Sequence, residues 1–387
     1  MKRITYLFII MLFFACNRNS IRIGDTVNIK INLEKTQDKE NVGDFQNRFS
    51  INRIIPLETS EISILGYISQ VIVSEKDIFI MDGMQNAIFR YDMDGKFIKK
   101  IEHQGNGPQE YIRTTNIAVA DNKLYVLDNM GKKILLYDID GKYLNAFTLD
   151  HRGYQLLVEP NGNMIVTGSY FDDYMLNVYN NIGEKIANYF PREEKFVGTT
   201  LVRTTYNSLK FYKGGFYFTN YFDPTVYYIK DNEVKPLAVF DFGINNIPED
   251  FFKDPQALLS LFSEYRNKSV MGISGLTLTD DLIIFTPEEG PDSYVVYYDR
   301  KRNIYMSNKG FDIPFSTFFG RYNAPMGYTE NNEYYSTVNN GELSEMINEL
   351  EGKDRNFLSK YPFLKGIIPV KSNEDEKNPW IVFYTIK

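Results

Sequence analysis

Two segments of the chain place aromatic rings beside a carboxylate in the same order. Tyr170-Phe171-Asp172 and Tyr221-Phe222-Asp223 both read Tyr-Phe-Asp. Flat rings offer a ligand stacking surface, and an aspartate accepts hydrogen bonds from hydroxyl or amide groups. This combination suits a sugar or a peptide, so Tyr170, Asp172, Tyr221 and Asp223 are candidate ligand-binding residues. The alternative is a packing corner that the chain repeats for structural reasons.

Arginines occur near these segments. Arg203 and Arg321 are predicted to lie in long connections, and Arg113 lies in a similar one. The planar guanidinium group can hold a carboxylate through two parallel hydrogen bonds. Arg203 and Arg321 are therefore added to the candidate ligand-binding residues, with ordinary surface ion pairs as the alternative.

The composition leaves little material for a metal or a catalytic centre. The chain has 2 His and 1 Cys, too few for a histidine or thiolate metal cluster. Carboxylates are plentiful, and Glu288, Glu289 and Asp292 are candidate calcium ligands or acids. No catalytic residues and no cofactor are predicted, although calcium stays possible. The sequence favours a binding or scaffold module, with a calcium-dependent hydrolase or lactonase as the alternative.

Residues 1–15 have the pattern of an export signal. Lys2 and Arg3 precede a short apolar run, which is too short to span a bilayer as a lasting helix. Cys16, the only cysteine, follows directly and resembles the lipidated cysteine of a bacterial lipobox. A plain signal peptide with an incidental cysteine is the alternative. We expect acyl chains on Cys16 to be the only attachment to the membrane.

The elements that position these residues are visible in an internal repeat. Residues 77–101 align with residues 123–147 at a shift of 46, with 8 identities in 25 positions. A repeat of this length that contains several short strands is typical of a β-propeller blade. The identical pairs are Asp82/Asp128, Met84/Met130, Ile88/Ile134, Tyr91/Tyr137, Asp92/Asp138, Asp94/Asp140, Gly95/Gly141 and Lys96/Lys142.

Strand patterns continue along the chain and predict an all-β, six-bladed propeller over residues 49–387. Residues 16–48 are expected to form a tether with one peripheral strand near residues 27–33. The sixth blade lacks an outer strand of its own. We therefore expect residues 51–57 to pair beside the last strand, residues 380–386, and to close the ring.

Two inserts have helical spacing of their apolar residues, residues 255–266 and 342–350. Strands alternate in direction, so the connections between blades emerge on the same face as the connections between second and third strands. The long connections and both inserts belong to this face, whereas the opposite face carries tight Asp-Gly hairpins. We expect binding on the long-loop face, near blades three to five.

Three further segments resemble an uncharacterised family of Bacteroidetes lipoproteins with six-bladed, NHL-repeat-like propellers. They are Ile55-Pro56-Leu57-Glu58-Thr59, the stretch from Gln104 to Tyr111, and the stretch from Asn378 to Tyr384. The resemblance supplies no catalytic residues, and the ligand expected on the long-loop face is a glycan, a peptide or another envelope protein. No acidic cluster follows Cys16, which favours the periplasmic face in such lipoproteins. A net charge of −7 argues against nucleic acid as a partner.

Overall fold

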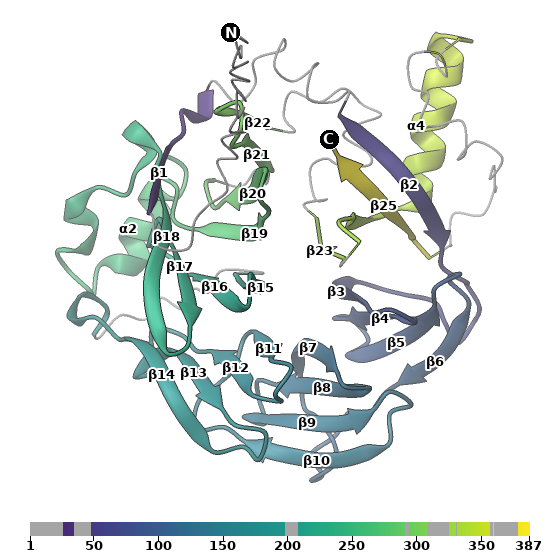
Figure 1. Cartoon of the computed structure of the whole chain (residues 1–387), viewed down its shortest axis with the longest axis horizontal. Coiled ribbons are helices and arrows are strands. Elements are labelled where there is room, and N and C mark those ends of the chain that lie inside the picture. The colour runs from purple at the N-terminus through teal and green to yellow at the C-terminus, as the bar shows by residue number, and fades with distance from the viewer. Residues whose placement is uncertain are drawn as a thin grey trace, which may run out of the picture.

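The structure, a computed structural model, describes residues 26–34, 48–197, 208–290, 294–307, 325–329, 331–356, 359 and 378–387. Six sheets, each with four antiparallel strands, stand around a central axis (Figure 1). This arrangement confirms the predicted six-bladed β-propeller.

The strands of the first five blades follow one another in chain order. Blade one contains β3 (Ile68–Val73), β4 (Asp77–Asp82), β5 (Ala87–Asp92) and β6 (Phe97–Ile101). Blade two contains β7 (Thr114–Ala120), β8 (Lys123–Asp128), β9 (Lys133–Asp138) and β10 (Tyr143–Thr148). Blade three contains β11 (Leu156–Val158), β12 (Met164–Thr167), β13 (Tyr174–Tyr179) and β14 (Lys185–Pro191). Blade four contains β15 (Leu209–Tyr212), β16 (Gly215–Thr219), β17 (Thr225–Lys230) and β18 (Glu233–Asp241). Blade five contains β19 (Ile273–Leu278), β20 (Leu282–Pro287), β21 (Val296–Asp299) and β22 (Ile304–Ser307).

Blade six closes the ring with strands from both ends of the described chain. Its sheet has the order β23 (Gly327–Tyr328), β24 (Tyr334–Val338), β25 (Trp380–Ile386) and β2 (Phe49–Pro56). β2 and β25 are antiparallel, with Ile51 opposite Tyr384 and Ile55 opposite Ile381. β25 is a continuous apolar run whose first five residues are buried, as expected for a strand covered on both faces. The predicted closure is confirmed.

β1 (Val27–Lys30) adds a fifth strand to blade four. It pairs in parallel with the outer strand β18, with Val27 opposite Ala238. Ile29 and Ile31 are 1% and 2% exposed and join the core between blades four and five. The backbone N–H of Asn32 donates to the hydroxyl of Tyr305 in blade five. The segment that contains β1 therefore connects the outer strands of blades four and five.

The repeated aspartates organise the long-loop face of blades one and two. Asp82 is fully buried and accepts hydrogen bonds from the backbone N–H groups of Gly66, Tyr67, Met84 and Gln85. Asp128 accepts from the corresponding groups of Ile112, Arg113 and Gly131. Each carboxylate ties the connection that enters its blade to the loop between the second and third strands. Repetition of Asp82 and Asp128 thus has a structural cause.

Two other repeated pairs belong to the hairpins and the core. Gly95 and Gly141 both have φ of +80°, a conformation that a residue without Cβ adopts at little cost. This confirms the predicted tight turns. Tyr91 and Tyr137 are fully buried, and their hydroxyls donate to the carbonyl oxygens of Ser63 and Gln109.

Polar side chains connect neighbouring inner strands. The side-chain amide of Gln70 donates to the Ile117 carbonyl oxygen at 2.9 Å and accepts from the Ile117 N–H at 2.8 Å. The side-chain amide of Gln155 accepts from the Ser208 N–H and donates to the Ser208 hydroxyl, both at 2.8 Å. Between blades four and five, the Lys210 ammonium group instead donates to the Thr277 hydroxyl at 3.0 Å. Burial lowers the pKa of Lys210 to about 8.

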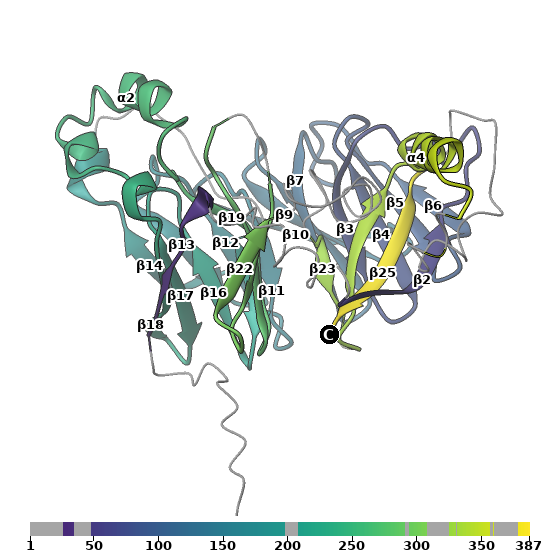
Figure 2. The same cartoon turned by 90° about the horizontal axis from the view of Figure 1, so that it is seen from above.

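The helices gather on one face of the ring. α2 (Leu258–Tyr265) and α4 (Asn340–Lys353) both project from the same side in Figure 2. The shorter 3₁₀ turns η2 (Glu194–Phe196), η3 (Gly243–Asn245) and η4 (Glu249–Phe252) belong to connections that emerge on this face. The face that carries these helices and turns is the long-loop face. Among the described residues, no helix has the length and apolar character that a membrane crossing requires.

Candidate functional site

The two Tyr-Phe-Asp segments lie in equivalent loops on the long-loop face, but their tyrosines are buried. Tyr170 is 3% exposed and Tyr221 is 7% exposed. The Tyr170 hydroxyl donates to the Tyr221 carbonyl oxygen, and burial raises the pKa of Tyr170 well above its usual value. The Tyr170 ring packs against Phe196 with 4.0 Å between ring centroids. These contacts support the packing corner, because buried ring faces have no surface to offer a ligand.

The aspartates of the two segments stabilise their own loops. Asp172 accepts hydrogen bonds from the Ser169 N–H at 2.7 Å and the Ser169 hydroxyl at 2.9 Å. Asp223 accepts from the Thr225 N–H at 2.9 Å and the Tyr227 hydroxyl at 2.8 Å. Both aspartates also line cavities, Asp172 in blade three and Asp223 in blade four. They can therefore face a ligand where the tyrosines cannot.

The remaining predicted positions cannot be placed. Arg203, Arg321 and Cys16 lie outside the described residues, as does Asp292. Arg113, which is described, is exposed beside the Asp128 loop.

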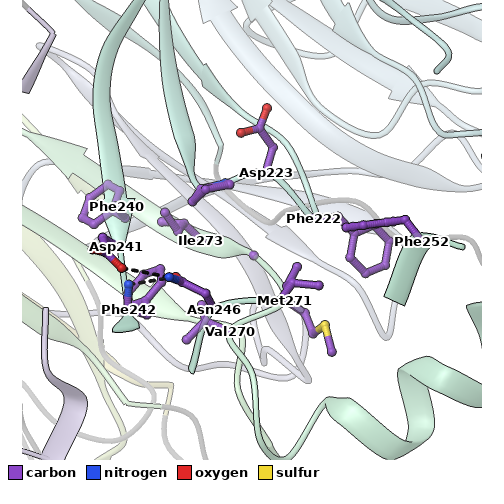
Figure 3. A pocket seen from close by; sticks show the side chains of 13 residues that line it. Phe222, Asp223, Phe240, Asp241, Phe242, Asn246, Phe252, Val270, Met271 and Ile273 are labelled. Atoms are coloured by element: carbon purple, nitrogen blue, oxygen red, sulfur yellow. Dashed lines mark hydrogen bonds between the residues drawn. The ribbon is translucent and has the colours of Figure 1, made fainter. Parts of the chain in front are cut away.

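An apolar cavity of about 330 Å³ lies where the insert between blades four and five folds back on blade four. Figure 3 shows Phe222 and Phe252 on one side of it and Phe240 and Phe242 on the other, with Met271 between them. Phe222 follows β16, Phe240 and Phe242 lie at the end of β18, and Phe252 ends η4. The cavity thus exists only because a long connection returns to the blade that it leaves. We call it the phenylalanine cavity.

One edge of the phenylalanine cavity is polar and held in place. Asp241 accepts hydrogen bonds from the Gly243 N–H at 2.9 Å and the Asn246 side-chain amide at 2.8 Å. These two contacts, that from Gly243 first, lower the pKa of Asp241 and favour its ionised form. The Asn246 amide oxygen in turn accepts from the Phe242 N–H at 2.9 Å. Asp223 adds a second carboxylate to the lining.

Apolar side chains are also exposed on the same insert. Ile244, in the turn after Phe242, is 89% exposed, and Leu259 on α2 is 51% exposed. An apolar cavity with exposed apolar neighbours and a few fixed polar groups is typical of a binding site. Of the residues around this cavity, the sequence pattern had indicated only Phe222 and Asp223. The others could have been suspected from the density of phenylalanine at 240–242 and 251–252 in a long connection.

A second, polar cavity of about 250 Å³ lies between blades two and three. Its lining includes Asp150 and His151 from the connection between these blades, and Phe171 and Asp172 from the Tyr-Phe-Asp loop. Asn177 and Asn188, directly opposite each other on β13 and β14, also line it. We call it the asparagine cavity.

Of the candidate calcium ligands, the Glu289 carboxylate has other partners, and Asp292 lies outside the described residues. Glu289 accepts hydrogen bonds from the Asn245 amide at 3.1 Å and from the Tyr294 hydroxyl at 3.0 Å. The backbone of Glu288 pairs with Met271 and Gly272. Within the part of the chain that the structure describes, no three His, Cys, Asp or Glu side chains converge as a metal site would require. The described geometry therefore offers calcium no formed cluster of ligands.

Comparison with known proteins identifies a family but no activity. The model of a family described as a domain of unknown function, DUF4934, matches residues 28–385. The match begins within β1 and ends within β25. No curated protein matches the chain.

Two solved structures share the architecture. A protein from Bacteroides fragilis NCTC 9343, described as exported, has a TM-score of 0.67 and 16% identity, over 94% of this chain and 100% of that one. A member of the DUF4221 family from Bacteroides vulgatus ATCC 8482 has a TM-score of 0.54 and 9% identity, over 88% and 98% of the two chains. At these identities, the likeness concerns the fold.

Proposed function

The chain belongs to the DUF4934 family, and we propose that it is a binding module of the cell envelope that holds a segment of a partner polypeptide. The observation that carries the proposal is the phenylalanine cavity on the long-loop face. An envelope location is supported by the signal-like residues 1–15 and by the similarity in fold to a protein described as exported. Acyl chains on Cys16 would provide the anchor, with the periplasmic face favoured.

The shape and lining of the cavity suit one large apolar side chain. Its volume of about 330 Å³ is at the lower end of the range for ligand sites. Phe222 and Phe252 would stack on an aromatic or aliphatic group, which is how anchor side chains contribute most of the energy of protein interfaces. Exposed Ile244 would extend the apolar contact beyond the cavity.

The polar edge of the cavity selects the ligand residue that lies next to the bound apolar side chain. Asp223 and Asp241 are both carboxylates, and the hydrogen bonds to Asp241 favour its ionised form. A carboxylate pair attracts a cation, and it also accepts hydrogen bonds from backbone N–H groups. The proposed ligand is therefore a segment with an apolar side chain adjacent to Lys or Arg.

A displayed peptide library with Lys or Arg beside a random apolar position tests this proposal. Selected peptides should bind the wild type and bind Phe252→Ala at least about tenfold more weakly, because a stacking surface is lost. Asp241→Asn should weaken peptides with a basic neighbour more than matched peptides with Gln. Phe211→Ala is the control, since Phe211 is 48% exposed on β15 of the same blade and lies outside the cavity.

Two results would contradict the proposal. Selected peptides that bind wild type and Phe252→Ala equally would exclude the phenylalanine cavity as their site. Stabilisation of the protein by calcium, together with hydrolysis of a lactone, would instead favour the enzyme alternative, because a ligand of the native state raises the unfolding temperature.

A further inference from the structure

The asparagine cavity differs chemically from the phenylalanine cavity. Asp150, Asp172, Asn177 and Asn188 supply carboxylate and amide groups, which together accept and donate hydrogen bonds. Phe171 is the large apolar side chain beside them, and it is 49% exposed. From this combination we infer that the cavity binds one neutral sugar ring. This inference is independent of the proposed peptide ligand, because the two cavities have no lining residue in common.

His151 gives separate evidence for a ligand. It lines the cavity, is 5% exposed, and its Nδ1 is 2.9 Å from the carbonyl oxygen of Arg152. Since a carbonyl only accepts, Nδ1 carries a proton in this contact. Nε2 is buried and has no hydrogen-bond partner among the described residues. A buried ring nitrogen without a partner is costly, and a sugar hydroxyl, which can donate or accept, would offset this cost if it came within reach.

The paired asparagines provide the second half of the site. Asn177 is 2% exposed, and Asn188 on the neighbouring strand is exposed. Because they are directly opposite in the sheet, their amides lie on the same face of blade three. An amide pair can donate to one hydroxyl and accept from the next, as adjacent hydroxyls on a sugar ring require. Rigid strands hold this arrangement in place.

The charges around the cavity favour a neutral sugar over an anionic one. The Lys185 ammonium pairs with Asp150, and Arg192 pairs with Asp173 at 3.5 Å, so both cations have carboxylate partners. Asp172 binds the hydroxyl and N–H of Ser169, which are uncharged. A sugar carboxylate would therefore meet an excess of negative charge, whereas a neutral ring would not.

Phe171 provides the apolar surface for the sugar. The C–H face of a pyranose ring packs on aromatic side chains, and such aromatic contacts contribute beyond their buried area. Among the residues of Tyr170-Phe171-Asp172, the ring that meets solvent is that of Phe171, and Asp172 lies next to it. The acceptor and the stacking surface thus come from adjacent residues of one loop.

Saturation-transfer NMR on the intact soluble chain tests the inference. The probes are glucose, galactose, mannose and N-acetylglucosamine at millimolar concentration, with glucuronate as the anionic counterpart. We expect at least one neutral sugar to receive saturation and glucuronate to receive none. Phe171→Ala and Asn188→Ala should each weaken the binding about three- to tenfold. Both residues are exposed, so these variants should fold.

Ile182→Ala is the matched control. Ile182 is 67% exposed on the same blade and lies in the hairpin of the opposite face. Retention of sugar binding by this variant, with loss in Phe171→Ala and Asn188→Ala, supports the inference. Absence of transfer to every neutral sugar would overturn it, as would equal binding by wild type and Phe171→Ala. Neither result depends on the phenylalanine cavity, which Phe252→Ala tests separately.

Discussion

Single side chains of the long-loop face divide into those that hold loops and those that meet solvent. Tyr170 belongs to the first group, with its hydroxyl on the Tyr221 carbonyl and its ring against Phe196. Phe171, one residue later, belongs to the second group. Adjacent residues of a loop therefore have opposite roles.

We expect Tyr170→Phe to destabilise the protein without affecting ligand binding. The substitution removes one buried hydrogen bond and leaves the Tyr221 carbonyl without this donor, which costs about 1–3 kcal/mol of unfolding free energy. Urea unfolding measures the loss, and Tyr67→Phe is the control because Tyr67 is 64% exposed. Unchanged stability together with reduced ligand affinity would instead show that Tyr170 is a ligand-binding residue.

Lys210 should make stability depend on pH in a defined window. Its pKa is about 8 in the folded protein and 10.5 without the fold. Between these values the unfolded chain binds a proton that the folded protein does not, so stability rises with pH from about 8 to 10.5. Below pH 8, Lys210→Met should be more stable than wild type by about 1–3 kcal/mol, the cost of the desolvated charge.

Urea unfolding of both proteins at pH 7, 8.5 and 10 measures this effect. The advantage of Lys210→Met should shrink as pH increases, and comparison with wild type cancels the contribution of the buried tyrosines. Lys142→Met, at an exposed hairpin position, is the control. A stability difference that is constant across the three pH values would show that Lys210 is not desolvated.

At the scale of elements, the pairing of β2 with β25 is the feature on which the ring depends. Deletion of residues 376–387 removes β25 and leaves β2 and β24 without their shared partner. It also removes Ile381 and Phe383, which are fully buried between blades six and one. We expect an insoluble or molten product with weak near-ultraviolet circular dichroism and strong dye binding.

A point variant keeps this prediction testable if the deletion cannot be purified. Val382 is fully buried in β25, whereas Thr385 in the same strand is only partly buried. Val382→Lys should lower the melting temperature far more than Thr385→Lys, because it buries a charge. A deletion product that melts cooperatively within a few degrees of the intact chain would contradict closure through β25.

The elements were the most predictable part of the molecule. Apolar runs of strand length and the Asp-Gly hairpins identify blades one and two, since both signals are local. Closure was also predictable, because a sixth blade lacked one strand and residues 51–57 had no other partner. α4 covers Asn340–Lys353 and is longer than the predicted insert at both ends; it begins earlier because Asn339 caps its first turn.

The cavities could not be predicted in the same way. The alternation of a strand indicates which side chains are buried, but no such period applies in a loop. Tyr170 and Phe171 were therefore indistinguishable, although one is buried and the other exposed. The phenylalanine cavity depends on how the insert returns to blade four, which brings Phe252 to Phe222 across 30 residues. That return is set by tertiary packing.

For the molecule as a whole, β1 would determine the direction from which a lipid anchor on Cys16 reaches the propeller. β18 ends at the long-loop face, and β1 runs parallel to it, so the chain enters β1 from the side of the tight hairpins. The hydroxyl of Thr26 donates to the carbonyl of Pro236, further from the long-loop face than Asp241. A lipid on Cys16 is therefore expected to leave the long-loop face turned away from the membrane.

Cys16→Ser tests the anchor itself. The variant should lose acylation and move from the membrane fraction to the soluble fraction, because acyl chains on one residue are the proposed attachment. Radioactive palmitate labelling and fractionation measure both effects, with Ser20→Ala as a control in the same segment. Membrane retention of the unlabelled variant would require another attachment.

The closing strand pair also determines when the protein can become native. Among the described strands, β2 is one of the first in chain order and β25 is the last, and their contacts join residues more than 300 positions apart. Until β25 arrives, blade six has no third strand, and the seam with blade one lacks Ile381 and Phe383. Contacts of such sequence separation form late in folding. If the chain crosses a membrane through a secretion channel in order of synthesis, the propeller therefore cannot close during the passage. The pairing of β2 with β25 would form only after β25 has crossed.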